Sequence, residues 1–384
     1  MEVITVAYDG LINYSIVKEL KNKIINGKID KIFQPNFDEI LLGIYCNGIK
    51  YALDLNVNPK YYRANLTTNT KPNPSQAPNF CMTLRKYLLG THISDIYTIN
   101  LERIIFIEFD GYSKSNDFSR KKLIIELMGK YSNIILVDSK DIIIESLKHF
   151  SVNSGAIRNI YSGAKYILPS TDKLDFMSIR DKEDFYQILN NNAIRYQSNS
   201  LSYLISNTFT GICQSSMSSF QSDLDISDTF DTTSSAKLFE YIYNTINMKN
   251  VICKNHVNDY SLSIISTPKK NDLQINFFLD DYYTKKERNF IFLNYRNNLL
   301  KLVLTKLNKL NNMLDNVNIK INECKDAEKY KLYGELIISN LYRINDYNTN
   351  SITLENYYDN NKPITIDLDG SISPSLNAKK FFKK

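Results

Sequence analysis

The chain has 384 residues, 43% hydrophobic and 23% charged, with 47 basic and 41 acidic side chains that leave a formal net charge of +6. This length predicts two or three domains, and the mild positive charge is compatible with a nucleic-acid partner without requiring one. Five scattered cysteines without a CxxC pair and three distant histidines argue against a disulfide framework and a metal site, so no metal or cofactor is expected.

The N-terminal segment carries an acid at Glu2 and shows no basic stretch followed by an apolar one. No run along the chain approaches the roughly 18 consecutive apolar residues that a membrane-spanning helix needs. We therefore expect a cytoplasmic protein without a membrane segment.

Residues 1–175 predict a mixed, mostly antiparallel β domain with helices packed on it, the first part of an α+β multidomain protein. Apolar residues over 11–26 repeat with helical spacing, and Gly27 follows at a position that suits a C-cap. Asn47-Gly48 marks a tight hairpin turn, and 79–90 is typical of a second helix. Strand-like runs occupy 28–35, 39–48, 50–57, 102–110, 122–129, 133–139 and 142–147.

Residues 176–285 contain helical runs in place of alternating ones and predict a second, helical domain, with a short β-like patch over "SLSIIS" and "LQINFF". A helix from about residue 286 to 345 follows, which at 1.5 Å per residue is roughly 90 Å long. Its apolar residues recur in alternating three- and four-residue steps, the a/d pattern of a coiled coil. This seam consists of Leu300, Val303, Leu307, Leu310, Leu314, Val317, Ile321 and Cys324.

Downstream of the long helix, the sequence predicts a small β unit and then the start of another helix near Ser375 or Asn377. No partner helix for the seam is present between these segments. The pattern favours a return helix beyond the last residue over a partner helix from another chain.

A series of motifs in a fixed order carries a family resemblance. They are AYDG (7–10), KIDKIFQP (28–35), NFCMTLRKYLLG (79–90), NLERIIFIEF (100–109), ELMGKYSNIILVD (126–138), DAEKYKLYGELIISNLYRI (326–344), LENYYDNNKPITIDLD (354–369) and SPSLNAKKFFKK (373–384). Together they resemble the NFACT family, whose bacterial members are the RqcH proteins, formerly called fibronectin-binding protein A homologues. The resemblance implies an NFACT-N domain with a glycosylase-N-like fold at 1–175 and a helix-hairpin-helix domain at 176–285. At 286–384 it implies the first coiled-coil helix and M region, truncated before the NFACT-R domain.

The resemblance also implies a non-enzymatic, RNA-binding role in ribosome quality control. Family members bind the 50S ribosomal subunit that still carries peptidyl-tRNA and a stalled nascent chain. They recruit tRNA, chiefly alanyl-tRNA in bacteria, for template-free C-terminal tailing, while the peptidyl transfer belongs to the ribosome. The long helix would then supply reach toward a ribosomal protein at the stalk base.

The family's functional acid near the N-terminus falls on Asp9, and its Asp-Arg pair falls on Glu102-Arg103, where this chain has the longer acid. An arginine can grip phosphate with two hydrogen bonds or stack on an exposed base. Neighbouring residues in a strand point to opposite faces, so Glu102 and Arg103 are not expected to form a simple pair. The alternative is a structural ion pair between Arg103 and an acid such as Asp9.

The residues of the loop "GKYSN" between two strand-like runs fit either an ordinary hairpin tip or a loop that faces a ligand, and the family resemblance favours the second. Gly129 suits a turn with positive φ, Lys130 offers a charge to phosphate and Tyr131 offers a stacking face. Ser132 and Asn133 offer short hydrogen bonds.

Arg85 and Lys86, on the predicted helix 79–90, are further candidates for RNA contact, against the ordinary alternative of a solvated helix face. The segment "NTFTGICQSSM" (207–217) occupies the helix-hairpin-helix position. Such hairpins bind phosphates through backbone N–H groups near glycines, and here Gly211 is the single glycine.

The older family name and the fold each suggest one other class of function. The older family name suggests a surface adhesin that binds fibronectin, but the absence of a signal peptide and a wall-anchoring motif counts against it. The glycosylase-like fold suggests a DNA-processing enzyme. Those glycosylases use a proline directly after the initiator Met as their nucleophile, and this chain has Glu2 there.

Overall fold

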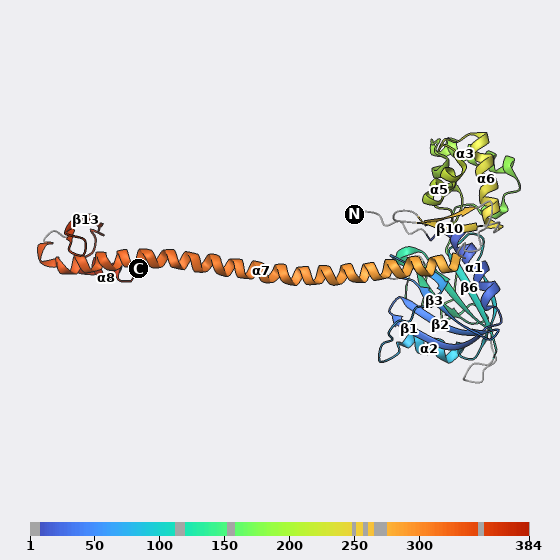
Figure 1. Ribbon diagram of the computed structural model, residues 1–384, viewed down its shortest axis with the longest axis horizontal. Helices are drawn as coiled ribbons and strands as arrows, with labels where there is room; N and C mark the ends of the chain where they lie inside the picture. Colours follow the sequence, from blue (N-terminus) through green and yellow to red (C-terminus); the bar gives the residue numbers. More distant parts are fainter. Residues whose placement is uncertain are drawn as a thin grey trace. The chain divides into compact units, whose positions relative to one another are not determined.

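The computed structural model describes residues 8–111, 120–151, 158–247, 251–255, 260–264, 275–344 and 349–383, and structural statements below concern these residues. Glu2, on which the argument against a glycosylase depends, lies outside them. The chain divides into two compact units, Met1–Phe290 and Ile291–Lys384. Helices and strands combine as an α+β protein, as the sequence predicted (Figure 1).

A nine-stranded sheet forms the body of the first unit, in the order β4-β3-β2-β1-β5-β6-β7-β8-β9, with antiparallel pairing between all neighbours. Its strands are β1 (Lys28–Asn36), β2 (Glu39–Cys46), β3 (Ile49–Asn56), β4 (Arg63–Leu66), β5 (His92–Tyr97), β6 (Ile104–Asp110), β7 (Lys121–Glu126), β8 (Asn133–Val137) and β9 (Ile143–Ser146). The predicted hairpin turn is present, because Asn47 and Gly48 both have positive φ between β2 and β3.

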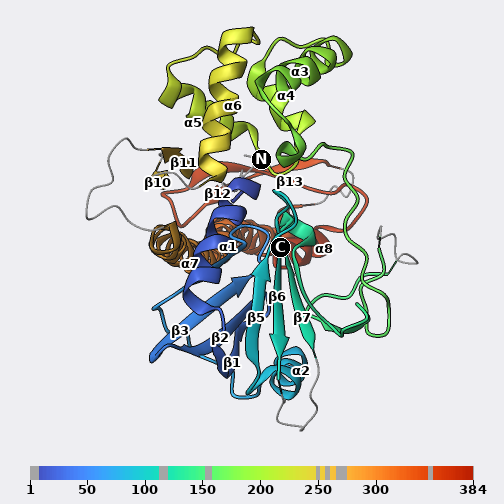
Figure 2. The same ribbon diagram turned by 90° about the vertical axis from the view of Figure 1, so that its right-hand side faces the viewer.

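Two helices pack on this sheet: α1 (Gly10–Ile24) and α2 (Asn79–Leu88). α1 ends differently from the prediction, because the left-handed residue after it is Asn26, at φ 62°, rather than Gly27. Gly27 is needed for a different reason: a Cβ there would lie 2.5 Å from Ile44 Cγ2 on β2. Figure 2 shows α2 at one end of strands β5 to β7.

The helical domain contains α3 (Lys182–Tyr196), α4 (Leu201–Thr208), α5 (Gln214–Leu224) and α6 (Thr232–Ile246), followed by the hairpin β10 (Val251–Asn255) and β11 (Tyr260–Ile264). The "LQINFF" part of the predicted β patch is wrong from Ile275 onward, because α7 (Ile275–Ser339) already begins there. Buried Ile275, Leu279 and Tyr283 recur every four residues, which is a helical period. The Glu19 carboxylate accepts hydrogen bonds from the N–H groups of Ile275 and Asn276, so it satisfies the first turn of α7.

An ionic cluster fixes the first turns of α7 to the sheet. The guanidinium of buried Arg63 lies 2.6 Å from Asp54 Oδ2 and 2.7 Å from Glu287 Oε1 on α7. Lys71 pairs with Glu39 and, at 2.7 Å, with Glu287. We call these five residues the α7 anchor. It contains three acids and two bases, so the three carboxyl groups share two cations.

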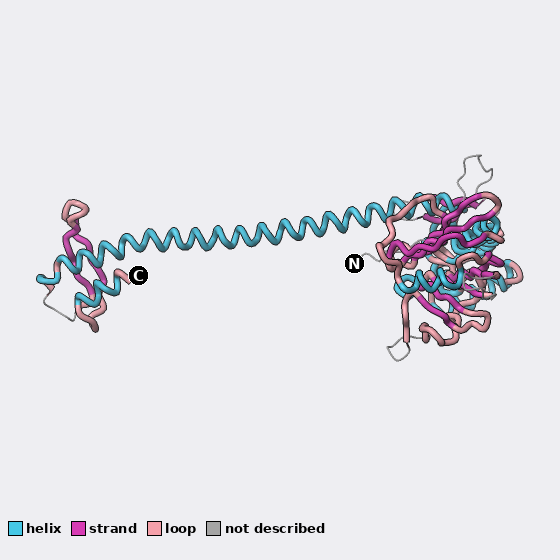
Figure 3. The backbone as a smooth tube through the Cα atoms, turned by 90° about the horizontal axis from the view of Figure 1, so that it is seen from below, coloured by secondary structure: helices cyan, strands magenta, loops and turns pink. Residues whose placement is uncertain are grey.

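The second unit contains the rest of α7 and a small β unit. Every apolar residue of the predicted seam on α7 from Leu300 to Cys324 is exposed among the described residues. Further along, β12 (Ser351–Asn356) and β13 (Lys362–Asp367) form a hairpin, and α8 (Pro374–Phe381) begins where the sequence predicted. These elements share a small core with the last turns of α7 (Figure 3). Within the described residues, no helix combines the length and apolarity required to cross a membrane.

Candidate nucleic-acid interface

Arg103 lies in a turn directly before β6, not within a strand. The expectation that Glu102 and Arg103 point to opposite faces therefore rested on a wrong premise. The half-buried Arg103 donates a hydrogen bond of 2.9 Å to the Tyr62 hydroxyl. No ion pair joins it to Asp9 or to another carboxylate of the described residues, so its charge is not neutralised by a direct partner.

The Lys130–Tyr131 loop lies at the same end of the sheet as Arg103. The Leu127 N–H, at the start of this loop, donates to the Arg103 carbonyl at 2.8 Å. Both Lys130 and Tyr131 are exposed, and the Lys130 Nζ lies 4.8 Å from the centre of the Tyr131 ring. Gly129 has φ +60°, as the turn prediction requires. The sheet thus brings Lys130, which has no ion pair among the described residues, and the exposed Tyr131 ring to the same end as Arg103.

Ser132 and Asn133, by contrast, are fully buried and serve the fold. The Ser132 hydroxyl accepts a hydrogen bond from the Met128 N–H, which closes the turn. The Asn133 side chain bonds the backbone of Lys148 through both of its polar atoms. The prediction that these two side chains face a ligand is wrong, since their hydrogen bonds are already used inside the protein.

Asp9 is buried, with 4% of its surface exposed, and it joins two domains. Its carboxylate caps α1 by accepting from the Ile12 N–H, and it also accepts from the Ser216 hydroxyl at 2.6 Å in the first turn of α5. Burial raises the pKa of Asp9, and the Ser216 hydrogen bond partly offsets this. The family's functional acid is therefore placed as an anchor between the sheet and helical domains.

The contact between the two domains around Asp9 requires glycine at positions 10 and 211. The Gly10 N–H donates to the Gly211 carbonyl at 2.7 Å. A Cβ on either glycine would lie 1.8 Å from the Leu101 carbonyl oxygen, and Gly211 also has φ +70°. Gly211, in the turn between α4 and α5, thus allows three backbone segments to meet at one point.

A pocket of about 470 Å³ opens beside this contact. It lies between the sheet domain, the segment before the helical domain and the α4–α5 turn. The lining residues are Tyr8, Asp9, Arg103, Lys173, Tyr203, Ser206, Asn207, Gly211, Ile212, Cys213 and Gln214. We call this the hairpin pocket. It brings together Asp9, Arg103 and Gly211, three residues that the sequence analysis selected separately.

Lys173 is a pocket residue that the sequence analysis missed. Its ammonium donates at 2.6 Å to the Ser206 carbonyl, a neutral partner. Burial and the nearby Arg103 charge lower the pKa of Lys173, and Glu102 partly offsets them. Burial also raises the pKa of Glu102, against the effect of Arg103. No pattern in the sequence could have linked Lys173 with Arg103, because the fold alone brings the two segments together.

Arg85 and Lys86 lie at the opposite end of the sheet from Arg103. α2 leads into β5, whose first residue pairs with Asp110 at the far end of β6. Over the seven residues of β6 this separation is roughly 20 Å. The Arg85 Nε donates to the Ile32 carbonyl at 2.8 Å, whereas Lys86 is exposed. The structure therefore does not group these two residues with the other candidates.

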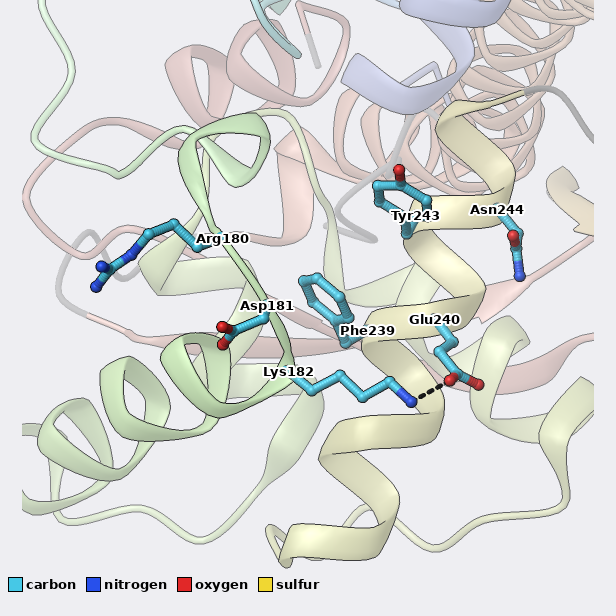
Figure 4. Close-up of a pocket in the computed structure, with 7 residues that line it drawn as sticks. All are labelled: Arg180, Asp181, Lys182, Phe239, Glu240, Tyr243 and Asn244. Atoms are coloured by element: carbon cyan, nitrogen blue, oxygen red, sulfur yellow. Dashed lines mark hydrogen bonds and ion pairs between the residues drawn. The ribbon is translucent and has the colours of Figure 1, made fainter.

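A second pocket, of about 580 Å³, lies in the helical domain between the start of α3 and α6 (Figure 4). Lys182 in this pocket pairs with Glu240, and Arg180 pairs with Asp184. Because both cations already have carboxylate partners, this pocket is a poorer candidate for binding an anion than the hairpin pocket.

The architecture is that of a multidomain α+β protein in which a sheet domain, a helical domain and a long helix follow one another. The family model described as "NFACT N-terminal and middle domains" matches residues 9–384, so the chain belongs to the NFACT family. This confirms the resemblance seen in the sequence.

Two curated relatives, both named "Rqc2 homolog RqcH", are similar to this chain. The protein from Streptococcus pneumoniae (strain D39) is 29% identical over 381 residues, and the one from Bacillus subtilis is 28% identical over 385 residues. Each match covers 98% of this chain and 66% of the relative. The chain thus spans just under two thirds of the length of these relatives.

Solved structures show the same fold. The N-terminal part of the fibronectin/fibrinogen-binding protein from Streptococcus suis matches with a TM-score of 0.60 and 28% identity, over 72% of this chain and 99% of that one. The N-terminal domain of the fibronectin-binding protein PavA from Streptococcus pneumoniae matches with a TM-score of 0.51 and 30% identity, over 73% and 99%.

Proposed function

We propose that this chain is the RNA-binding front part of a ribosome quality control factor. In this proposal the protein binds the 50S subunit that carries peptidyl-tRNA and a stalled nascent chain. It recruits tRNA, with alanyl-tRNA expected, for template-free tailing of that chain, and the ribosome carries out the transfer itself. Membership of the NFACT family and the names of the RqcH relatives support the proposal.

One observation in the fold carries the RNA-binding part of the proposal. Arg103 and the Lys130–Tyr131 loop lie at one end of the sheet, and no described carboxylate pairs with either cation. Cations can neutralise RNA phosphates, and an exposed tyrosine ring can stack on an unpaired base. In this scheme the long helix α7 supplies reach toward a ribosomal protein at the stalk base, and its apolar seam packs against a partner helix.

Co-sedimentation of the complete protein with 50S–peptidyl-tRNA complexes tests the proposal. We expect the complete protein to enrich tRNA, and the Arg103→Ala variant to recover about ten times less of it while retaining its melting temperature. The control is Lys165→Ala, which removes the same charge from an exposed position that no described ion pair uses. Recovery of tRNA no higher than background at low salt would refute the proposal.

Surface adhesion is a second candidate, favoured by the names of the solved fibronectin- and fibrinogen-binding neighbours. Cell fractionation separates the two functions. An adhesin would be found mainly with the cell envelope, whereas a quality control factor would be found with ribosomes.

A further inference from the structure

We propose that the hairpin pocket binds a backbone phosphate of RNA, held between Arg103 and Lys173. This inference rests on the proposed RNA-binding function and deepens it by adding a residue outside the family motif and by naming the chemical group that is bound.

The partners of the two cations are the first argument. Arg103 donates to the Tyr62 hydroxyl and Lys173 to the Ser206 carbonyl, and both acceptors are neutral. No described carboxylate lies within ion-pair distance of either cation. Two cations that face one pocket without a counter-ion between them repel each other, and a bound anion would relieve that repulsion.

The acids near the pocket do not act as paired counter-ions for Arg103 and Lys173. Asp9 lines the pocket, but its carboxylate already accepts from the Ile12 N–H, the Ser216 hydroxyl and the Cys213 thiol. Glu102 lies close enough to Arg103, Lys173 and Asp175 to interact with all three electrostatically, yet no described ion pair joins Glu102 or Asp175 to either cation. Both cations therefore line the hairpin pocket without an ion pair to a described carboxylate.

Neutral groups of the helical domain complete the site. Tyr203, Asn207 and Gln214 line the same pocket and can donate hydrogen bonds to phosphate or sugar oxygens. A volume of about 470 Å³ accommodates a phosphate with its adjoining sugar. The phosphate is favoured over a base as the bound group because both charged donors are cations, and most hydrogen bonds to nucleic acids go to the backbone.

The test is a binding titration of the complete protein with fluorescently labelled unfractionated tRNA at several salt concentrations. We expect Lys173→Ala to weaken binding five- to tenfold and to reduce the slope of log K against log salt by about one, the value for one lost phosphate contact. Lys173→Arg should restore most of both quantities. The matched control, Lys165→Ala, should leave the affinity within twofold and the slope unchanged.

Three outcomes would overturn the inference. If Lys173→Ala behaves like the control while Arg103→Ala weakens binding, the proposed function stands and the role of Lys173 fails. If affinity falls with no change in salt slope, the group contacted is not a phosphate. If the unaltered protein binds no tRNA, the inference falls together with the proposed function.

Discussion

Two clusters of basic residues in the first unit differ in what faces them. In the α7 anchor, Arg63 is paired with two carboxylates and Lys71 with three, and the cluster joins a helix to the sheet. In the hairpin pocket, Arg103 and Lys173 have only neutral partners. Residue type alone therefore does not distinguish a structural cation from one that can bind a ligand. The charge of the partners that the fold places next to each cation does distinguish them.

The largest expected effect comes from removing Arg63, and the contrast between the two clusters fails if Arg63 proves dispensable for stability. Arg63→Ala removes the close cation of buried Asp54 and leaves Glu287 with Lys71 alone, so we expect a loss of about 3–5 kcal/mol in the free energy of unfolding. Chemical denaturation measures it. Lys50→Ala, at an exposed position on β3, should change stability by less than about 0.5 kcal/mol. Equal effects of the two substitutions would contradict a structural role for the anchor.

Asp54 extends the comparison, because it is a fully buried carboxyl group that lies against both Arg63 and the acid Glu39. Its Oδ1 atom is buried without a hydrogen-bond acceptor or donor in the described residues, although the Glu39 carboxylate is close enough to share a hydrogen bond. Burial raises the pKa of Asp54 to about 8, against the effect of Arg63. We expect Asp54 to keep a proton and to share it with the Glu39 carboxylate.

Protonated Asp54 has a neutral mimic in asparagine. At pH 6, we expect Asp54→Asn to change the free energy of unfolding by less than about 1 kcal/mol, and Asp54→Ala to lower it by about 2–4 kcal/mol. The folded protein holds the Asp54 proton between its ordinary pKa and about 8, where the unfolded chain has released it. Titration of Asp54 therefore lowers the free energy of unfolding as the pH rises from its ordinary pKa to about 8. Unfolding curves from pH 5 to 9 should show a flatter pH dependence for Asp54→Asn, and an unchanged slope would exclude the shared proton.

The smallest expected effect concerns the exposed cations at the two ends of the sheet. Lys130→Ala should weaken tRNA binding about two- to fivefold, because a single exposed phosphate contact is lost. Lys86→Ala removes the same charge at the other end and should leave binding within twofold. Fluorescence anisotropy compares the two variants directly. A greater loss from Lys86→Ala would move the interface to α2.

Local structure could be predicted where a short segment determines it. The turn residues Asn47, Gly48 and Gly129 have the expected positive φ, and α2 and α8 begin where the sequence indicated. The start of α7 at Ile275 was missed, because a short apolar run fits a strand and a helix equally well. The anchoring contacts of that first turn come from Glu19, far away in the sequence.

The candidate site was harder to predict, because its chemistry depends on long-range contacts. Sequence motifs selected Asp9 and Arg103, but burial of Asp9 and its bond to Ser216 follow from the packing of two domains. Likewise, Ser132 and Asn133 are polar residues of a loop that the fold turns inward. Lys173 carries no local signal and becomes a candidate because the fold places it in the same pocket as Arg103.

The crossing of Gly10, Leu101 and Gly211 has a consequence for how this protein can be divided. Since no side chain fits between these backbones, the α4–α5 hairpin packs directly on the start of α1. Its Ser216 hydroxyl donates a hydrogen bond to the Asp9 carboxylate. A fragment that stops at the end of the sheet domain would expose both the glycine and the acid to water. We therefore expect the sheet and helical domains to melt in one cooperative transition, and to resist separation by proteases at the segment that connects them.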